Sequence, residues 1–275
     1  MALTLFLCKK SMFQGFYIED LCFNDYFYKK GRSLYADMSK NIQEKLSFLE
    51  AEECVLDAGK IQSDWFPNIK ADIFLSHSHA DKNLAIAFAG WLNENFGLRS
   101  FIDSCLWGYC DDLLEKIDNN FCKNDNDKTY NYKSRNASTS IVHMILMNAL
   151  TKMIDNTECL MFLNTPNSIV LKDDISEKTY SPWIFSEIET SRYIRKIVPD
   201  RLKEKIKDST KYFSVLNESQ LKVAFPANTS HLINLSCDEL KEWNNTYAKR
   251  KSIFATPTNK GLPLNYLYRI KNIIN

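Results

Sequence analysis

The sequence predicts an α/β fold, a doubly wound parallel sheet covered by helices, and two observations support this prediction. Short apolar runs of strand length alternate with longer segments whose apolar residues recur at helical spacing. A strand, a helix and a second strand fit between Ala71 and Ile102, and such a crossover joins parallel strands. Strands of this kind are buried on both faces, so they lack polar alternation.

Composition excludes several classes of protein. The 275 residues are 45% hydrophobic and 25% charged, which is ordinary for a folded soluble domain. A net charge of +1 gives no bulk attraction to nucleic acid, so we expect no such partner. Without a long apolar run or a signal peptide, we expect a cytoplasmic protein with no membrane contact. Eight irregularly spaced cysteines without a CxxC pair predict free thiols, not a disulfide framework.

Residues 1–66 show no strand alternation and are expected to form a mostly helical N-terminal extension. Apolar residues recur at helical spacing along Ser33–Leu49, which predicts an amphipathic helix packed on the main domain. The sequence Trp65–Pro67 ends this region, because the residue before a proline disfavours helix. The main domain is expected over residues 67–250, followed by a helical tail over 251–275.

The main domain is expected to contain strands and helices in alternation. The predicted strands cover residues 73–75, 98–102, 159–163, 221–225 and 232–235. The predicted helices cover residues 81–96, 113–121, 139–154, 181–196, 236 onward and 264–274. The segment 104–112, which is rich in aromatic and small residues, and the polar segments 122–137 and 167–180 are expected to be loops. The segment 122–137 is expected to be a surface insertion.

Several helix ends carry recognisable caps. Gly97 suits the left-handed position that follows a helix. Ser181 and Pro182 suit the N-cap and the first helical residue. Ser236 and Glu239 have the spacing of a capping box, in which each side chain bonds the other's backbone.

The carboxyl ends of parallel strands meet at one edge of a sheet, and ligands of α/β proteins bind outside that edge. This rule places Ser76–His79, Asp103–Trp107 and Asn164–Pro166 on one rim. Side chains that carry chemistry are therefore expected among these residues.

Trp183 and Glu187 are four residues apart on a predicted helix, so they share a face. A flat ring beside one carboxylate suits cleavage of a glycosidic bond to a cationic leaving group. The carboxylate stabilises an oxocarbenium-like transition state, and nicotinamide leaves as a neutral molecule without a general acid. The more common alternative is a core tryptophan and a carboxylate paired with a nearby Lys or Arg.

The run His77–Asp81, HSHAD, is similar to the HxHxD core of binuclear metallo-hydrolases. That motif continues with a histidine for the second metal, and here Lys82 stands in its place. Only His143 and His231 remain elsewhere in the sequence to complete a site. We therefore expect no metal, and a turn with a helix cap at Ser78 or Asp81.

Four segments in order resemble the motifs of a Toll/interleukin-1 receptor (TIR) domain, in particular of bacterial TIR proteins. DIFLSHS at 72–78 resembles the first-strand motif, and FID at 101–103 resembles the second strand. Residues 104–112 resemble the BB loop, and SPWIFSE at 181–187 is similar to the WxxxE segment. The resemblance covers roughly residues 70–240, and the insertion at 122–137 departs from it.

The resemblance implies a flavodoxin-like fold and, in the catalytic branch, cleavage of NAD+. The catalytic glutamate of the family falls on Glu187, and its WxxxE tryptophan falls on Trp183. The resemblance further implies a substrate site formed by Ser76, His77, Asp103 and Trp107.

The expected activity is that of an NAD+ glycohydrolase or ADP-ribosyl cyclase, with NAD+ as substrate and no further cofactor. The resemblance implies a role in bacterial anti-phage defence of the Thoeris type, where the ADP-ribose product activates a separate effector. It also implies a homo-oligomer assembled through the BB loop. Two alternatives stay open: a TIR interaction module without chemistry, and an enzyme like a nucleoside deoxyribosyltransferase.

Overall fold

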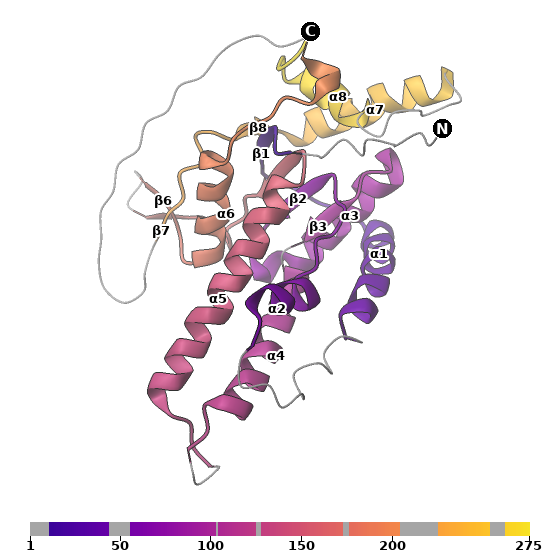
Figure 1. Ribbon diagram of the computed structural model, residues 1–275. Helices are drawn as coiled ribbons and strands as arrows, with labels where there is room; N and C mark the ends of the chain where they lie inside the picture. The colour runs from indigo at the N-terminus through magenta and orange to yellow at the C-terminus, as the bar shows by residue number, and fades with distance from the viewer. Residues whose placement is uncertain are drawn as a thin grey trace, which may run out of the picture.

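The computed structural model describes residues 11–43, 56–102, 104–124, 128–172, 176–203, 225–253 and 262–275. Its centre is a five-stranded sheet, and every neighbouring pair of strands is parallel (Figure 1). The order across the sheet is β3-β2-β4-β1-β8. The strands are β1 (Gln14–Ile18), β2 (Ile73–Ser76), β3 (Ser100–Ile102), β4 (Cys159–Leu163) and β8 (Ile233–Leu235). The predicted α/β class with a parallel sheet is confirmed.

Helices cover both faces of this sheet. They are α1 (Asp25–Gln43), α2 (Ala58–Trp65), α3 (Lys82–Phe96), α4 (Ser104–Phe121), α5 (Tyr132–Asp155), α6 (Pro182–Tyr193), α7 (Cys237–Ile253) and α8 (Leu262–Ile270), with single turns η2 (His79–Asp81) and η3 (Asp200–Leu202). A small antiparallel sheet contains β5 (Val170–Lys172), β6 (Ser176–Thr179) and β7 (Phe225–Pro226).

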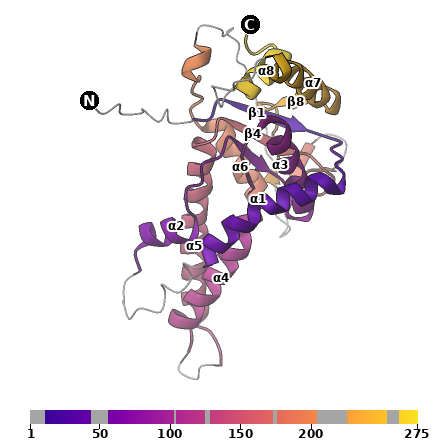
Figure 2. The same ribbon diagram turned by 90° about the vertical axis from the view of Figure 1, so that its right-hand side faces the viewer.

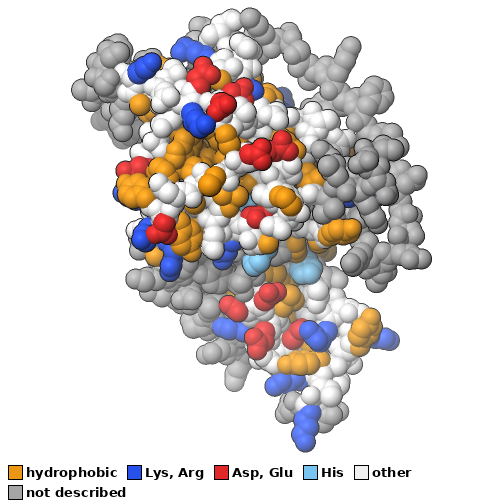
Figure 3. Space-filling model, turned by 180° about the vertical axis from the view of Figure 1, so that it is seen from behind, with side chains coloured by type: hydrophobic (Ala, Val, Ile, Leu, Met, Phe, Trp, Pro, Cys, Tyr) orange, Lys and Arg blue, Asp and Glu red, His pale blue; other side chains and the backbone are white. Residues whose placement is uncertain are grey.

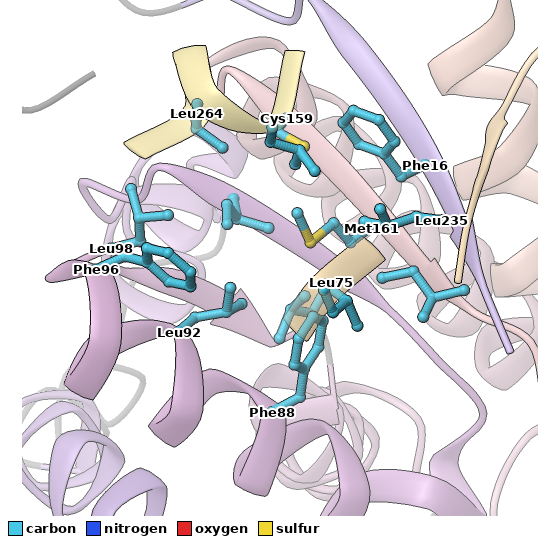
Figure 4. Close-up of a cluster of buried hydrophobic side chains, with 14 of the residues drawn as sticks. Phe16, Leu75, Phe88, Leu92, Phe96, Leu98, Cys159, Met161, Leu235 and Leu264 are labelled. Carbon is cyan, nitrogen blue, oxygen red and sulfur yellow. The ribbon is translucent and has the colours of Figure 1, made fainter. Parts of the chain in front are cut away.

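Two hydrophobic cores lie on opposite faces of the sheet. One contains side chains of α2, α4, α5 and α6, and the other contains side chains of α1, α3, α7 and α8. Figure 4 shows part of the second core, where Phe88 and Leu92 of α3 approach Leu75 and Met161 of the strands. Because both faces are covered, every residue of β2 and β4 is buried.

The N-terminal region contains a strand of the central sheet, which the prediction of a mostly helical extension did not include. Residues 14–18 form β1, which lies inside the sheet between β4 and β8 (Figure 2). The strand was missed because the five residues QGFYI contain only a short apolar run, residues 16–18, which cannot be assigned to strand or helix from periodicity alone. The predicted helix is present as α1, although it begins at Asp25, and residues 44–49 of the prediction lie outside the described residues. The N-terminal region is therefore part of the main domain.

Two glycines allow α1 and α3 to pack closely. A Cβ atom on Gly31 would overlap the carbonyl of Ile86, and one on Gly90 would overlap the carbonyl of Phe27. Backbone carbonyls cannot move away as a flexible side chain can, so we expect Gly90→Ala to lower the free energy of unfolding by about 1–3 kcal/mol. Urea denaturation measures this change. The control Gly59→Ala on α2 meets only the Asp57 side chain and is expected to cost less; equal costs would contradict the prediction.

The expected loop at 104–112 is the first half of helix α4, so this prediction is wrong. Small and aromatic residues suggested a loop, but the helical stripe was present in the sequence. Cys110, Leu113 and Ile117 are buried at spacings of three and four, and they join the core on the α5 side.

The expected insertion at 122–137 is partly helical. Helix α5 begins at Tyr132, with the Asn131 side chain accepting a hydrogen bond from the backbone of Ser134. Asp118 of α4 accepts hydrogen bonds from Arg135 at 2.8 Å and Ser138 at 2.6 Å. These polar contacts hold α4 and α5 together where the pair projects away from the sheet (Figure 1). Residues 125–127 lie outside the described residues.

Three further predictions are modified. The segment 167–180 contains strands β5 and β6, so it is not simply a loop. Of the strand predicted at 221–225, residues 221–224 lie outside the described residues, and Phe225 begins β7. The C-terminal helix α8 belongs to the core, where Leu267 and Tyr268 are fully buried.

Three of the predicted caps are confirmed, whereas the cap predicted at Ser78 or Asp81 is wrong, because neither side chain makes a cap hydrogen bond. Gly97 follows α3 with φ of 66°, and the Ser181 hydroxyl accepts a hydrogen bond from the backbone of Ile184 at 3.3 Å. Ser236 and Glu239 form the reciprocal bonds of a capping box at 2.8 and 3.2 Å. These local signals are readable because they depend on neighbouring residues alone.

His231 makes the stability of the fold depend on pH. Burial, with the charges of Lys196 and Arg192, lowers the pKa of His231 to about 3. The unfolded chain binds a proton at this residue below about pH 6.5, whereas the folded chain does not until about pH 3. As the pH is lowered from about 6.5 to about 3, the free energy of unfolding is therefore expected to fall by at most about 1.4 kcal/mol per pH unit. Between pH 7 and pH 4, the urea concentration at the unfolding midpoint should decline less steeply for His231→Gln than for the wild type. Equal declines in the two proteins would contradict the prediction.

Candidate active site

A carboxylate and a hydroxyl meet at the carboxyl end of β2. Ser76, the last residue of that strand, donates a hydrogen bond of 2.6 Å from Oγ to Oε2 of Glu187 on α6. Ser76 is fully buried and Glu187 is 1% exposed. The two residues are 111 positions apart, so the fold brings together two segments that the sequence singled out separately.

Glu187 reaches this position because of how α6 begins. Ser181 caps the helix and Pro182 is its first residue, which fixes the point where the helix starts. Ile184 and Ile188 are buried in the core on the α5 side, and Glu187 lies between them in the sequence and is buried as well. The packing of α6 therefore directs the carboxylate to the end of the strand.

His77 and Ser104 lie beside this pair. The Nε2 atom of His77 is 3.0 Å from the Ser104 hydroxyl, and its Nδ1 atom is 3.3 Å from the carbonyl of Leu75. A carbonyl can only accept, so Nδ1 donates, and in the neutral ring Nε2 accepts the proton of Ser104. Lys82 also donates to the Ser104 carbonyl at 3.4 Å. The starts of α3 and α4 are thus held at the end of β2.

Trp183 packs on a neighbouring helix. Its ring lies edge-on to His143 of α5, with ring centroids 5.3 Å apart and planes at 86°. The ring is partly buried against the core on that side. This contact corresponds to the alternative that the sequence left open for Trp183, a packing role between α5 and α6.

The structure does not describe the side chains of two predicted site residues, and it does not support a metal site at the HSHAD run. Asp103 lies outside the described residues, and Trp107 lies on α4 with a side chain that the structure does not describe. Within the HSHAD run, His77 is buried and His79 is exposed. Among the described residues, no group of three or more His, Cys, Asp or Glu side chains could hold a metal ion.

The strand topology favours ligand binding at the same place. β2 leads into α3 on one face of the sheet, and β4 leads into α6 on the other face. Adjacent strands whose connections leave to opposite faces form the crevice where α/β proteins bind ligands. Two hydrogen bonds join the segments that follow β4 and β2, from Thr165 at 2.5 Å and Asn167 at 2.9 Å to the carboxylate of Asp81. The sequence did not single out this contact.

A second polar group was missed because β1 was missed. The hydroxyl of Tyr17 donates to Oε1 of Glu19 at 2.7 Å. The Asn164 amide donates to the Tyr17 hydroxyl at 2.6 Å and to Glu19 Oε1 at 2.9 Å. Asn164 was on the predicted rim, but its partners come from the N-terminal region. The run of polar residues after an apolar stretch, Glu19 and Asp20, was the signal available in the sequence.

A hollow of about 380 Å³ lies on the other face of the sheet. Its apolar walls come from the segment after β1 and from α1, α3 and α7, including Phe23, Phe27, Trp91 and Leu240. Figure 3 shows hydrophobic side chains gathered on the upper half of the molecule seen from behind. Glu187 is on α6, which packs on the opposite face, so this hollow is separate from the candidate site.

Comparisons with protein-family models, with curated proteins and with solved structures found no match. Within the described residues, no helix combines the length and apolar character needed to cross a membrane.

Proposed function

We propose that the protein is an NAD+ nucleosidase, either a glycohydrolase or an ADP-ribosyl cyclase, with Glu187 as its essential carboxylate. The observation that carries this proposal is the buried hydrogen bond between Ser76 and Glu187. It lies at the carboxyl end of a parallel sheet, where ligands of such folds bind. A carboxylate removed from water stabilises positive charge more strongly than an exposed one does.

The reaction uses this carboxylate in one step. The bond between C1′ of the ribose and the pyridinium nitrogen breaks, and its electron pair leaves with nicotinamide. Glu187 stabilises the positive charge that develops on the ribose, while Ser76 holds the Oε2 atom in place. Water then adds to C1′ and loses a proton, giving ADP-ribose, or a nitrogen of the adenine adds and closes a ring.

Access to the site requires movement. Glu187 is 1% exposed, so a substrate reaches its carboxylate only after a covering segment has shifted. The proposed active form is a homo-oligomer in which one protomer opens the site of the next. In an anti-phage role, the released nucleotide would activate a separate effector protein.

The order of the strands supports a flavodoxin-like relationship with one departure. The flavodoxin order is 2-1-3-4-5. If β2 is taken as strand 1 of that order, then β3 lies at the position of strand 2, β4 at that of strand 3 and β8 at that of strand 5. The fourth place is filled by β1, which comes first in the chain. The proposed TIR relationship therefore requires that a strand from the N-terminal region, β1, replaces the fourth strand of the flavodoxin order.

A second candidate is an interaction module without chemistry. Helix α5 exposes 54% of Ile141 and 66% of Met144. Exposed apolar side chains on a projecting helix favour contact with another protein. A deoxyribosyltransferase-like enzyme remains the third alternative, and replacing NAD+ by deoxynucleosides in the same assay tests it.

The experiment is nicotinamide release from NAD+ by the full chain at high protein concentration, with the products separated by chromatography. Glu187→Gln is compared with Glu189→Gln, which makes the same substitution two residues along α6. Release by the wild type and Glu189→Gln, and not by Glu187→Gln, supports the proposal. Release by all three, or by none, contradicts it, and the second result favours the interaction module.

A further inference from the structure

Glu19 faces the same side of the sheet as the candidate site. In the strand register, Ser76 pairs with Phe162 of β4, and Phe162 pairs with Tyr17 of β1. Side chains two residues apart on a strand share a face. The hydrogen bond between Tyr17 and Glu19 shows that this rule continues past the end of β1. The carboxylates of Glu19 and Glu187 therefore lie along one edge, on one face.

The spacing of the strand ends that carry Ser76, the partner of Glu187, and Glu19 suits a dinucleotide. Neighbouring strands are about 4.8 Å apart, so β2 and β1, with β4 between them, are about 10 Å apart. A dinucleotide carries two riboses joined through a pyrophosphate. When the ribose that reacts is at Glu187, the second ribose extends along the edge toward Glu19.

The Glu19 carboxylate is oriented for a ligand. Its Oε1 atom accepts two hydrogen bonds, from Tyr17 and Asn164, which fix the side chain. Its Oε2 atom contacts no donor among the residues that the structure describes, and the side chain is exposed. A fixed carboxylate oxygen at a strand end accepts a hydrogen bond from a ribose hydroxyl.

We propose that Glu19 binds the 2′-hydroxyl of the adenosine ribose and makes the site prefer NAD+ to NADP+. A phosphate on that oxygen removes the donor and adds negative charge beside the carboxylate. This inference rests on the proposed function, since it assigns the two ends of the same substrate. If the contacts of Glu19 only fastened β1 to β4, its substitution would change stability and leave nucleotide preference unchanged.

The test is equilibrium binding of NAD+ and NADP+, measured by titration calorimetry on the full-length Glu187→Gln protein, in which we expect turnover to be too slow to consume the ligand during the titration. We expect NAD+ to bind at least about tenfold more tightly, as the loss of a hydrogen bond to a charged group predicts. Adding Glu19→Gln should bring the two affinities to within about threefold. Glutamine keeps an oxygen for Tyr17 and Asn164, so the fold should persist, which thermal melting checks. Glu242→Gln, exposed on α7, should leave the preference unchanged.

An unchanged preference in Glu19→Gln, or no binding of either nucleotide, overturns this inference. Failure of the proposed reaction gives a different result. In that case the wild type releases no nicotinamide, yet the preference for NAD+ is present and depends on Glu19. Conversely, if nicotinamide release requires Glu187 but the preference for NAD+ over NADP+ is unchanged in Glu19→Gln, the proposed reaction is supported and the role proposed for Glu19 is rejected.

Discussion

Glu187→Gln is expected to lower the rate of nicotinamide release by about 10³-fold, the loss typical when a charge-stabilising group is removed from a buried site. Glutamine is close to glutamate in volume and keeps an oxygen that can accept the Ser76 hydrogen bond. The fold should therefore persist, and the lost rate reports the lost charge. Initial rates at saturating NAD+ measure the effect, with circular dichroism as the check on folding.

Ser76→Ala is the matched comparison for this prediction. It removes the 2.6 Å hydrogen bond and leaves the carboxylate in place, so we expect a smaller loss of about tenfold. If Glu187→Gln retained more than a tenth of the wild-type rate, the carboxylate would not be the group that stabilises the ribosyl cation. Equal losses in the two variants would instead indicate that the position of Glu187 matters more than its charge.

The sequence predicted the parts of the site that depend on local signals. Ser181 and Pro182 fix the start of α6, and the apolar run of β2 fixes the strand, so Ser76 and Glu187 could both be selected. Their meeting followed from a general rule about parallel sheets. Only the structure shows that the Ser76 hydroxyl donates a hydrogen bond to the Glu187 carboxylate.

Prediction from the sequence was wrong for segments whose secondary structure depends on tertiary packing. β1 pairs with β4 and β8 in the sheet, but its five residues show no strand alternation, and only the polar residues Glu19 and Asp20 after it mark its end in the sequence. Residues 104–112 are helical, and Cys110 joins the core that includes side chains of α5. Without β1, the group formed by Tyr17, Glu19 and Asn164 could not be foreseen, since two of its members follow from that strand.

The second large effect concerns a buried ion pair at the opposite end of the sheet. Glu158 precedes β4 and is 4% exposed, and both its oxygens accept hydrogen bonds from the guanidinium of Arg201. The hydroxyl of Tyr268 on α8 donates to the same carboxylate at 3.0 Å, and Asn265 accepts from Arg201 at 2.8 Å. Burial, with the adjacent Glu158, holds the pKa of Tyr268 well above its usual value, so the hydroxyl stays a donor.

Arg201→Ala is expected to lower the free energy of unfolding by about 3–5 kcal/mol, because it leaves the Glu158 carboxylate buried without its cation. Urea denaturation measures the loss. Lys203→Ala is the control, since its ion pair with Asp200 is exposed and should contribute less than about 1 kcal/mol. Similar losses in both variants would contradict the prediction.

A double variant separates the cost of a stranded charge from the value of the pair. Glu158→Leu with Arg201→Met removes both charges, so it should cost less than Arg201→Ala alone. The pair lies at the amino end of β4, whereas Ser76 and Glu187 lie at the carboxyl end of β2. Nicotinamide release per folded molecule should therefore stay close to the wild-type value in every variant of this pair. A rate that fell along with stability would mean that the packing of α8 also controls the position of Glu187.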